Sequence, residues 1–104
     1  LRHNTRAFVE RVDFVTSLGH GEGGDHRARL GLRGAGPERV ITDLGVLEPD
    51  PATKELTLTR VHPGVTVDQV REATGWDLRV AADVAVSDPP SADELRVLRA
   101  LKAA

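Results

Sequence analysis

The sequence predicts an α/β fold in the order strand, loop, strand–strand hairpin, helix, strand, helix. Two β-rich runs, residues 40–47 and 56–61, flank a short proline-containing connection. After the second run comes a pattern typical of a helix N-terminus. A further apolar run and a second such pattern follow nearer the C-terminus. A chain of 104 residues has room for one domain with a modest core. We therefore expect residues 1–104 to form a single domain.

The first expected element is a short strand over Val12–Thr16, because this run is β-branched and aromatic. Residues 19–24 contain four glycines, which are costly to order, so regular structure should end there. Residues 25–32 then have the composition of one or two helical turns. A second break follows at residues 34–37, which contain two glycines and a proline.

Val40–Leu47 has the strongest strand signal in the chain, and Leu56–Val61 alternates apolar and polar residues. Such alternation is typical of a strand with one buried face. The connection between them, residues 48–53, has turn chemistry and is too short for a parallel crossover, so we expect a hairpin. Asp43 lies in a run that we expect to be buried on both faces. It should therefore bond to loop amides or to an arginine.

Thr66 and Gln69 have the spacing of a capping box, which predicts a helix over Thr66–Thr74 with Thr66 as its cap. Gly75 is placed to end this helix in the left-handed conformation. Leu78–Val86 predicts a further strand.

Ser91 and Glu94 repeat the capping-box spacing and predict a second, C-terminal helix. Leu95, Leu98 and Leu101 would lie along one side of it.

Composition argues against several classes of function. The chain has 14 basic and 16 acidic residues and only three aromatic ones, whereas nucleic-acid binding favours a basic face with stacking aromatics. No apolar run approaches the roughly 20 residues of a membrane helix. The absence of cysteine excludes disulfides and thiolate zinc sites and fits the reducing cytoplasm. We therefore expect a cytoplasmic protein that binds neither nucleic acid nor membrane.

The glycine-rich residues 19–24 follow an expected strand, and their backbone N–H groups could hold an anion such as a phosphate or a carboxylate. Their pattern fits neither of the common nucleotide-binding glycine motifs, and a mobile surface loop is the alternative. Glu22 could act there as a nucleophile or base. Because nothing nearby in sequence would fix its geometry, an ordinary solvated glutamate is the favoured interpretation.

Metal and triad chemistry have little support. None of the four histidines forms a helical pair with metal-ligand spacing, so no metal site is expected. Ser17, His20 and Asp25 include the residue types of a hydrolytic triad, but they fall within nine positions. Triads are assembled from distant segments on rigid elements, so no catalytic residue is predicted.

Three longer motifs occur in order along the chain: R-H-x-x-R-x-F-V-E-R-V-D-F-V-T-S-x-G-H-G, then G-P-x-R-V-I-T-D-L-G-V-L-x-x-D, then H-P-G-V-T-V-x-x-V-x-x-A-T-G-W. Together they resemble the C-terminal portion of the β subunit of class I coenzyme A transferases. The resemblance is strongest to the glutaconate CoA-transferase branch, which includes steroid ring-opening CoA hydrolases. It extends from Arg2 to Arg99.

The resemblance implies an open CoA-transferase-type sheet, completed by the N-terminal remainder of the β subunit and paired with an α subunit. The implied substrate is a coenzyme A thioester, with no permanently bound cofactor. In the family a glutamate in a motif like S-E-N-G takes the acyl group and then carries CoA. This chain lacks that motif. The fragment alone is therefore expected to be inactive, and both CoA transfer and ring-opening hydrolysis stay open.

Ser17, Gly19, His20 and Gly21 align with a family segment at the end of a strand, where open α/β sheets bind ligands. These four residues are the expected contacts with CoA or substrate. A free-standing interaction or binding domain is the alternative function. An isolated half-sheet should also expose an apolar patch that promotes association between copies of the chain.

Overall fold

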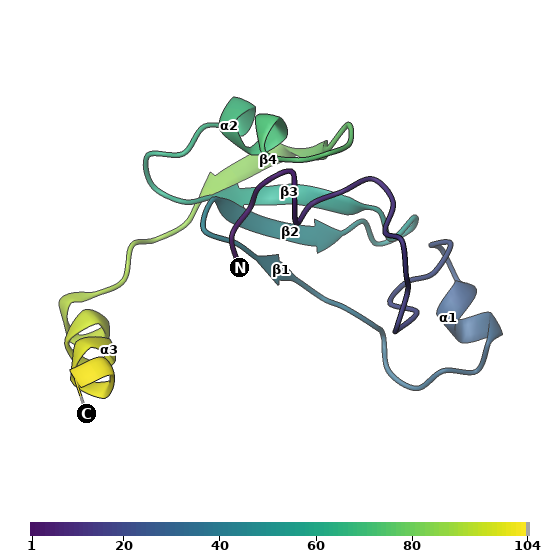
Figure 1. The fold of residues 1–104 in the computed structure, drawn as a ribbon, viewed down its shortest axis with the longest axis horizontal. Helices are drawn as coiled ribbons and strands as arrows, with labels where there is room; N and C mark the ends of the chain where they lie inside the picture. The colour runs from purple at the N-terminus through teal and green to yellow at the C-terminus, as the bar shows by residue number, and fades with distance from the viewer. Residues whose placement is uncertain (104) are drawn as a thin grey trace.

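The computed structural model describes residues 1–103, which form a four-stranded mixed sheet with a short helix packed on it. In chain order the elements are α1 (His26–Arg29), β1 (Val40–Ile41), β2 (Gly45–Pro49), β3 (Leu56–Val61), α2 (Val67–Glu72), β4 (Arg79–Val86) and α3 (Ala92–Ala103). The strand order is β1-β2-β3-β4. Figure 1 shows α2 above the sheet, with α1 and α3 at opposite ends of the molecule. The predicted α/β class is confirmed.

The predicted hairpin is confirmed, because β2 and β3 pair antiparallel. The single strand expected over Val40–Leu47 is wrong. This run folds back on itself, so that β1 pairs antiparallel with β2. The Thr42 hydroxyl oxygen accepts hydrogen bonds from the Leu44 and Gly45 amides, at 3.0 and 3.1 Å. A side chain that satisfies backbone donors in this way competes with continuation of the strand.

Asp50 holds the tip of the β2–β3 hairpin. Its carboxylate accepts hydrogen bonds from the backbone amides of Thr53 and Ala52, at 3.0 and 2.9 Å. These backbone hydrogen bonds lower the pKa of the Asp50 carboxyl. Lys54 follows in the left-handed region, with φ of 63°, and donates its N–H to the Asp50 carbonyl at 2.9 Å.

A bulge at Thr59 accommodates one extra residue in β3 while keeping Leu58 and Val61 in the core. Leu58 and Arg60 pair with consecutive residues of β2, so Thr59 is the extra residue. Uninterrupted alternation from Leu58 would place Arg60 in the core and Val61 outside. The bulge reverses this placement: Val61 is only 6% exposed and Arg60 is exposed.

α2 begins as predicted. The Thr66 hydroxyl accepts from the Gln69 amide at 3.2 Å, and the Gln69 side-chain oxygen accepts from the Thr66 amide at 2.8 Å, which confirms the capping box. The helix ends earlier than expected, at Glu72. Gly75 does not adopt the predicted left-handed conformation. Its N–H donates to the Phe8 carbonyl at 2.7 Å, and a Cβ there would lie 2.5 Å from that oxygen, so glycine permits a close approach of the N-terminal segment.

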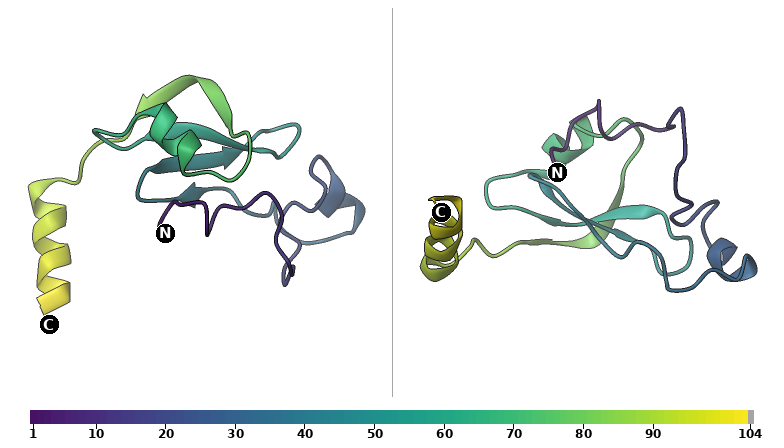
Figure 2. Two further views of the ribbon diagram at one scale, coloured as in Figure 1. Left: turned by 45° about the horizontal axis from the view of Figure 1, so that its top comes forward. Right: turned by 60° about the horizontal axis from the view of Figure 1, so that its bottom comes forward.

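β4 confirms the strand predicted over Leu78–Val86. It pairs in parallel with β3, and α2 lies in the crossover between them. The second capping box is also confirmed: the Glu94 amide donates to Ser91 Oγ at 3.1 Å, and the Ser91 amide donates to Glu94 Oε1 at 3.3 Å. α3 nevertheless has no buried residue, and it stands apart from the sheet (Figures 1 and 2).

The core lies between α2 and the sheet and is small. It contains Phe8, Leu47, Leu58, Val61, Val70 and Leu78. Twelve large apolar side chains are exposed among residues 1–103, more than the seven that are buried. The radius of gyration is 16.0 Å, whereas a compact domain of about 100 residues has a value of about 13 Å. The described chain is therefore less compact than an independent domain of its length.

The strand predicted over Val12–Thr16 is wrong, because this segment forms no regular structure. Val12, Phe14 and Val15 are 60%, 78% and 64% exposed. The helical turn expected within residues 25–32 is present as α1. Among residues 1–103 no helix combines the length and the apolar character needed to cross a bilayer.

Candidate site: a glycine loop docked against the β2–β3 hairpin

The four predicted site residues belong to the glycine loop, which we define as residues 17–24. The loop precedes α1, at the end of the molecule opposite α3 (Figure 1). Four of its residues have positive φ, and all four are glycine: Gly19, Gly21, Gly23 and Gly24. Two tight turns shape it, through hydrogen bonds of 2.9 Å from Gly21 N–H to the Leu18 carbonyl and from Gly23 N–H to the His20 carbonyl. The loop thus has a defined backbone path.

Arg27 of α1 ties this loop to the segment that follows the helix. Its Nη1 donates to the Gly19 carbonyl at 2.9 Å, and its Nη2 donates to the Arg33 carbonyl at 2.8 Å. Its Nε is buried and has no hydrogen-bond partner among the described residues. Gly36 is required beside it, since a Cβ at this position would lie 2.7 Å from Arg27 Cδ. Both partners of the guanidinium are neutral carbonyls, so these bonds leave its charge without a counter-ion.

Two histidines make further contacts in the same region. His20 Nε2 lies 2.7 Å from the Pro37 carbonyl oxygen. Because a carbonyl can only accept, Nε2 carries the proton. His26 Nδ1 accepts the Glu22 backbone N–H at 2.9 Å, and a Cβ on Gly21 would collide with the His26 ring. No hydrogen bond among the described residues fixes the Glu22 carboxylate, and the residue is exposed.

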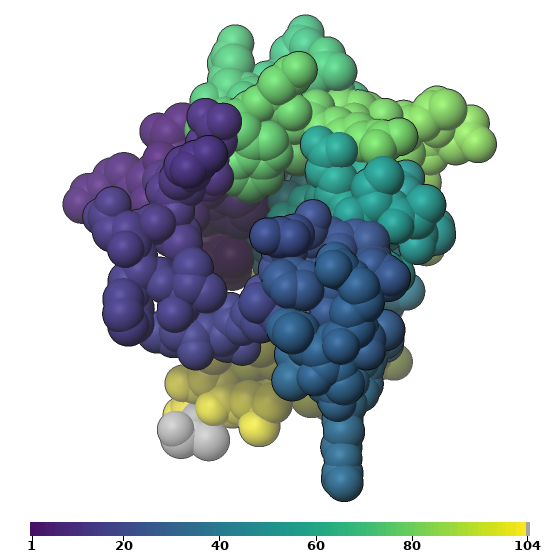
Figure 3. All heavy atoms as spheres, turned by 90° about the vertical axis from the view of Figure 1, so that its right-hand side faces the viewer, coloured from purple at the N-terminus to yellow at the C-terminus, as the bar shows by residue number. Residues whose placement is uncertain are grey.

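The tip of the β2–β3 hairpin docks on the glycine loop. Gly24 N–H donates to the Thr53 carbonyl at 3.0 Å, and a Cβ at Gly23 would lie 2.5 Å from the same oxygen. This docking places Lys54, at the hairpin tip, beside residues of the loop and of α1. Figure 3 views the molecule from this end, with the loop region and α1 in blue in front of the teal hairpin.

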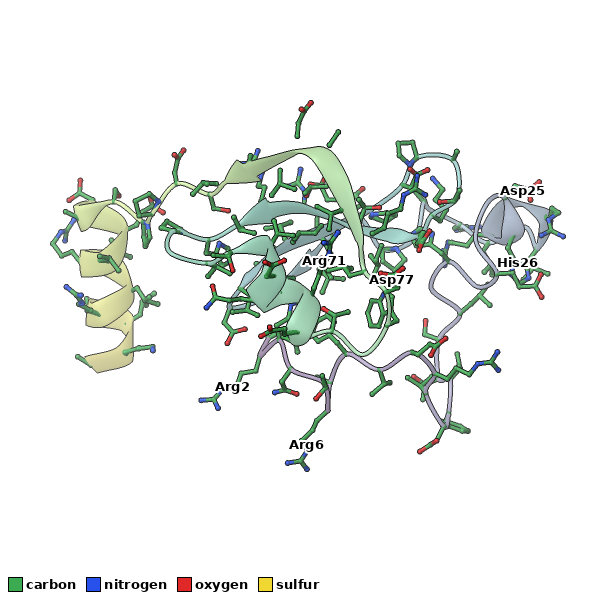
Figure 4. All side chains as sticks on the ribbon, turned by 90° about the horizontal axis from the view of Figure 1, so that it is seen from above. Arg2, Arg6, Asp25, His26, Arg71 and Asp77 are labelled. Carbon is green, nitrogen blue, oxygen red and sulfur yellow. The ribbon has the colours of Figure 1, made fainter. Side chains whose placement is uncertain are left out.

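His20, Arg27 and Lys54 together line a hollow of about 200 Å³, which we call the cationic hollow. Asp25 also lines it, but its carboxylate pairs with Arg29 at 2.8 Å. Figure 4 shows Asp25 at the start of α1, far from Arg71 of α2. The cationic hollow is thus remote from the helix that covers the core.

The four predicted site residues have different environments in the structure. His20 lines the cationic hollow. The Gly19 carbonyl accepts from Arg27, and Gly21 makes room for a histidine ring. Ser17 is exposed and does not line the hollow. Whether any of the four contacts CoA or substrate stays a prediction.

Arg27 and Lys54 were missed in the sequence. Lys54 carried one signal, since it is one of only two lysines in a chain with 14 basic residues. Its position beside the loop depends on contact between segments that are distant in the chain, and local sequence patterns do not predict such contacts.

A second hollow, of about 380 Å³, opens where β4 bows away from β3. Thr57 and Thr59 line it, together with Arg79. Arg79 lies 3.6 Å from Glu55 and 3.9 Å from Asp50. Unlike Arg27, this arginine already has carboxylate partners within the chain.

A buried polar cluster joins the N-terminal segment to the sheet. His3 Nε2 lies 2.7 Å from Thr74 Oγ1, and His3 Nδ1 lies 3.2 Å from Thr42 Oγ1. The Thr74 hydroxyl donates to the Val70 carbonyl, so it accepts from His3 Nε2–H. Burial lowers the pKa of His3, and the Asp43 carboxylate partly opposes this effect.

Asp43 also binds the His3 backbone amide, at 2.8 Å. The expectation that loop amides satisfy Asp43 is therefore confirmed. The expected burial of Asp43 is wrong, because the residue is exposed in the turn between β1 and β2. No group of three or more metal-ligating side chains with suitable geometry occurs among residues 1–103.

Residues 1–73 match the family model described as coenzyme A transferase. Over 103 residues, 99% of the chain, the sequence is 50% identical to the β subunit of 3-oxoadipate CoA-transferase from Pseudomonas knackmussii. It is also 40% identical, over 93 residues, to the β subunit of glutaconate CoA-transferase from Acidaminococcus fermentans. The chain spans 40% and 35% of the lengths of these two relatives.

Solved structures agree with the sequence relatives. Glutaconate CoA-transferase from Acidaminococcus fermentans superposes with a TM-score of 0.83 at 35% identity, over 94% of this chain and 38% of that chain. IpdAB of Rhodococcus jostii gives a TM-score of 0.73 at 30% identity, over 94% of this chain and 39% of that chain. The resemblance seen in the sequence motifs is confirmed. The chain belongs to the coenzyme A transferase family.

Proposed function

We propose that the chain is part of a CoA-transferase β subunit that acts on acyl-CoA thioesters together with an α subunit. The 50% identity to the β subunit of 3-oxoadipate CoA-transferase, over nearly every residue, carries this proposal. A coenzyme A thioester is then the substrate, and no permanently bound cofactor is needed. A cytoplasmic location fits this substrate and the cysteine-free composition.

Within this proposal the 104 residues supply scaffold and contact surface, and the reacting carboxylate lies in another part of the subunit. The exposed apolar side chains and the large radius of gyration support a fold completed by the rest of the subunit and by the α partner. Glu22 lacks the fixed geometry that a nucleophile needs. A free-standing interaction domain, the alternative, should have a more compact core than the one described.

Hydrolysis is the second candidate reaction. The chain is 34% identical over 101 residues to a cholesterol ring-cleaving hydrolase subunit, IpdB, of Rhodococcus jostii. This identity is lower than the 50% shared with the transferase subunit, so we favour CoA transfer.

An assay of the complete β subunit with its α partner tests the proposal. We expect transfer of CoA to a dicarboxylate acceptor such as 3-oxoadipate, little thioester loss without an acceptor, and no turnover by the 104 residues alone. Thioester cleavage at the same rate with and without acceptor would favour the hydrolase. Turnover by the 104 residues alone would contradict the proposal that the reacting carboxylate lies in another part of the subunit.

The contact role of the glycine loop is tested in the same complex. His20→Ala removes a ring that lines the cationic hollow, whereas His20→Gln keeps a side-chain N–H for the Pro37 carbonyl. If the loop faces the substrate, the alanine variant should raise KM for the acyl-CoA and the glutamine variant should do so less. Unchanged kinetics in both variants would remove the assignment of Ser17, Gly19, His20 and Gly21.

A further inference from the structure

We propose that the cationic hollow binds a phosphoryl group, with Arg27 and Lys54 as its principal ligands and His20 at its edge. Three separate segments meet there: the glycine loop, α1 and the tip of the β2–β3 hairpin. The hydrogen bond from Gly24 N–H to the Thr53 carbonyl joins the hairpin tip to the loop. The site is thus assembled by the tertiary fold.

The charges around the hollow favour an anion. Among the described residues, no carboxylate lies within ion-pair distance of Arg27 or Lys54. Asp25, the acidic residue that lines the hollow, is paired with Arg29. Two cationic side chains around one hollow repel each other unless an anion lies between them.

The hydrogen-bonding state of Arg27 points the same way. Its two terminal nitrogens donate to backbone carbonyls, which fixes the guanidinium plane. Its Nε–H is buried and has no acceptor among the described residues. Because this nitrogen is sealed from solvent, the donors that Arg27 can offer an anion are the second N–H groups of its two terminal nitrogens.

Lys54 is held in a backbone conformation that side chains rarely adopt. It is the one non-glycine residue with positive φ among residues 1–103. Such conformations persist where the surrounding structure imposes them, and they cluster at ligand sites. Here the Asp50 carbonyl accepts the Lys54 N–H, and the docked Thr53 carbonyl fixes the preceding peptide.

The size of the hollow limits the ligand. Pockets for drug-sized molecules measure about 300–1,000 Å³, so the roughly 200 Å³ here suits a single phosphoryl group better than a whole nucleotide. The source of that group rests on the proposed function, because coenzyme A carries a 3′-phosphate and a diphosphate. Free inorganic phosphate has the same chemistry, and the experiment must separate the two sources.

Equilibrium dialysis of radiolabelled inorganic phosphate, at low ionic strength, measures binding to the full chain purified with its partner subunit. Lys54→Gly removes the charge but keeps a residue that adopts φ of 63° without strain. We expect it to weaken phosphate binding about five-fold, the effect of one ion pair near water. Lys102→Ala, which removes the only other lysine charge, on α3, should leave the affinity unchanged. Equal affinities for Lys54→Gly and the parent protein, or no saturable binding, would overturn the proposal.

A second arm compares coenzyme A with dephospho-coenzyme A in the same complex. Tighter binding of coenzyme A that is lost in Lys54→Gly would identify its 3′-phosphate as the group in the hollow. Equal binding of the two compounds, with phosphate binding still sensitive to Lys54, would leave the phosphoryl site standing and overturn the 3′-phosphate as its source. Absence of CoA transfer in the activity assay, with both binding results intact, would contradict the proposed function alone.

Discussion

Residues 40–86 and residues 9–39 contain similar β-branched and apolar runs but fold differently. In the first region each β-rich run pairs with a neighbouring strand of the chain, and Leu47 and Leu58 are completely buried. In the second region the run Val12–Thr16 has no neighbouring strand in the described chain and stays irregular and exposed. The contrast shows that strand propensity mainly measures fit to a neighbouring backbone and core. A β-rich run that has no strand to pair with stays irregular and leaves its apolar side chains exposed.

The largest expected effect is a difference in unfolding free energy between a core substitution in the first region and an exposed one in the second. Leu58→Ala should lower the free energy of unfolding by about 2–5 kcal/mol, because it leaves a cavity in the core. Phe14→Ala should change it by less than about 0.5 kcal/mol, since the ring is 78% exposed. Urea unfolding followed by Trp76 fluorescence compares them. A comparable loss in both variants would show that Phe14 packs in solution and would erase the contrast.

A smaller effect is expected at Gly75, where residues 40–86 meet the N-terminal segment around Phe8 and Val9. Gly75→Ala should destabilise by about 1–3 kcal/mol, because the new Cβ would crowd the Phe8 carbonyl. Gly34→Ala is the control: its Cβ meets nothing within 4 Å, so it reports only the cost of a positive φ. The same unfolding assay applies. If Gly75→Ala proved no worse than the control, the N-terminal segment would not be held against α2 as described.

The two capping boxes allow a still finer comparison. Thr66→Ala should lower global stability by about 0.5–2 kcal/mol, because α2 contributes Val70 to the core. Ser91→Ala removes the same kind of cap from α3, which buries no residue. It should reduce helix content in circular dichroism without shifting the unfolding midpoint. A shift as large as that of Thr66→Ala would mean that α3 packs on the sheet.

The smallest expected effect is a dependence on pH. Burial lowers the pKa of His3 in the folded chain below its ordinary value of 6.5, so the unfolded chain binds the proton more readily. Stability should therefore fall as pH drops through about 6.5 and level off below the folded-state pKa of His3. The lowered pKa of Asp50 adds a loss only in the more acidic range below 3.8. Unfolding midpoints measured across this range test the effect.

His3→Gln should flatten the upper part of that profile. His26→Gln is the matched control, because His26 lies in α1 outside the core and its substitution should leave the slope intact. An unchanged slope in His3→Gln would contradict the role given to the buried cluster of His3, Thr42 and Thr74.

Much of the fold could be predicted from the sequence because its signals are local. Each capping box acts over three residues, and the Asp50 turn is completed within the hairpin. The missed features depend on segments far apart in the chain. The role of Gly75 is set by Phe8, and the turn at Thr42 lies against His3.

The candidate site follows the same rule. His20 was visible in a glycine-rich motif, whereas Lys54 acquires its place only when the hairpin docks on the loop. Arg27 looked like one more polar residue of a short helix. That its Nε is buried without a hydrogen-bond partner can be recognised only from the three-dimensional structure.

The bulge in β3 has a consequence for alignments of this family. If Thr59 were deleted, the strand would read L-T-L-R-V, a regular alternation that still turns Leu58 and Val61 inward and Arg60 outward. The extra residue is therefore unnecessary for sorting side chains between core and surface. What it adds is local bend and twist. A one-residue gap at this position in a homologue should change the curvature of the sheet while leaving the composition of its core unchanged.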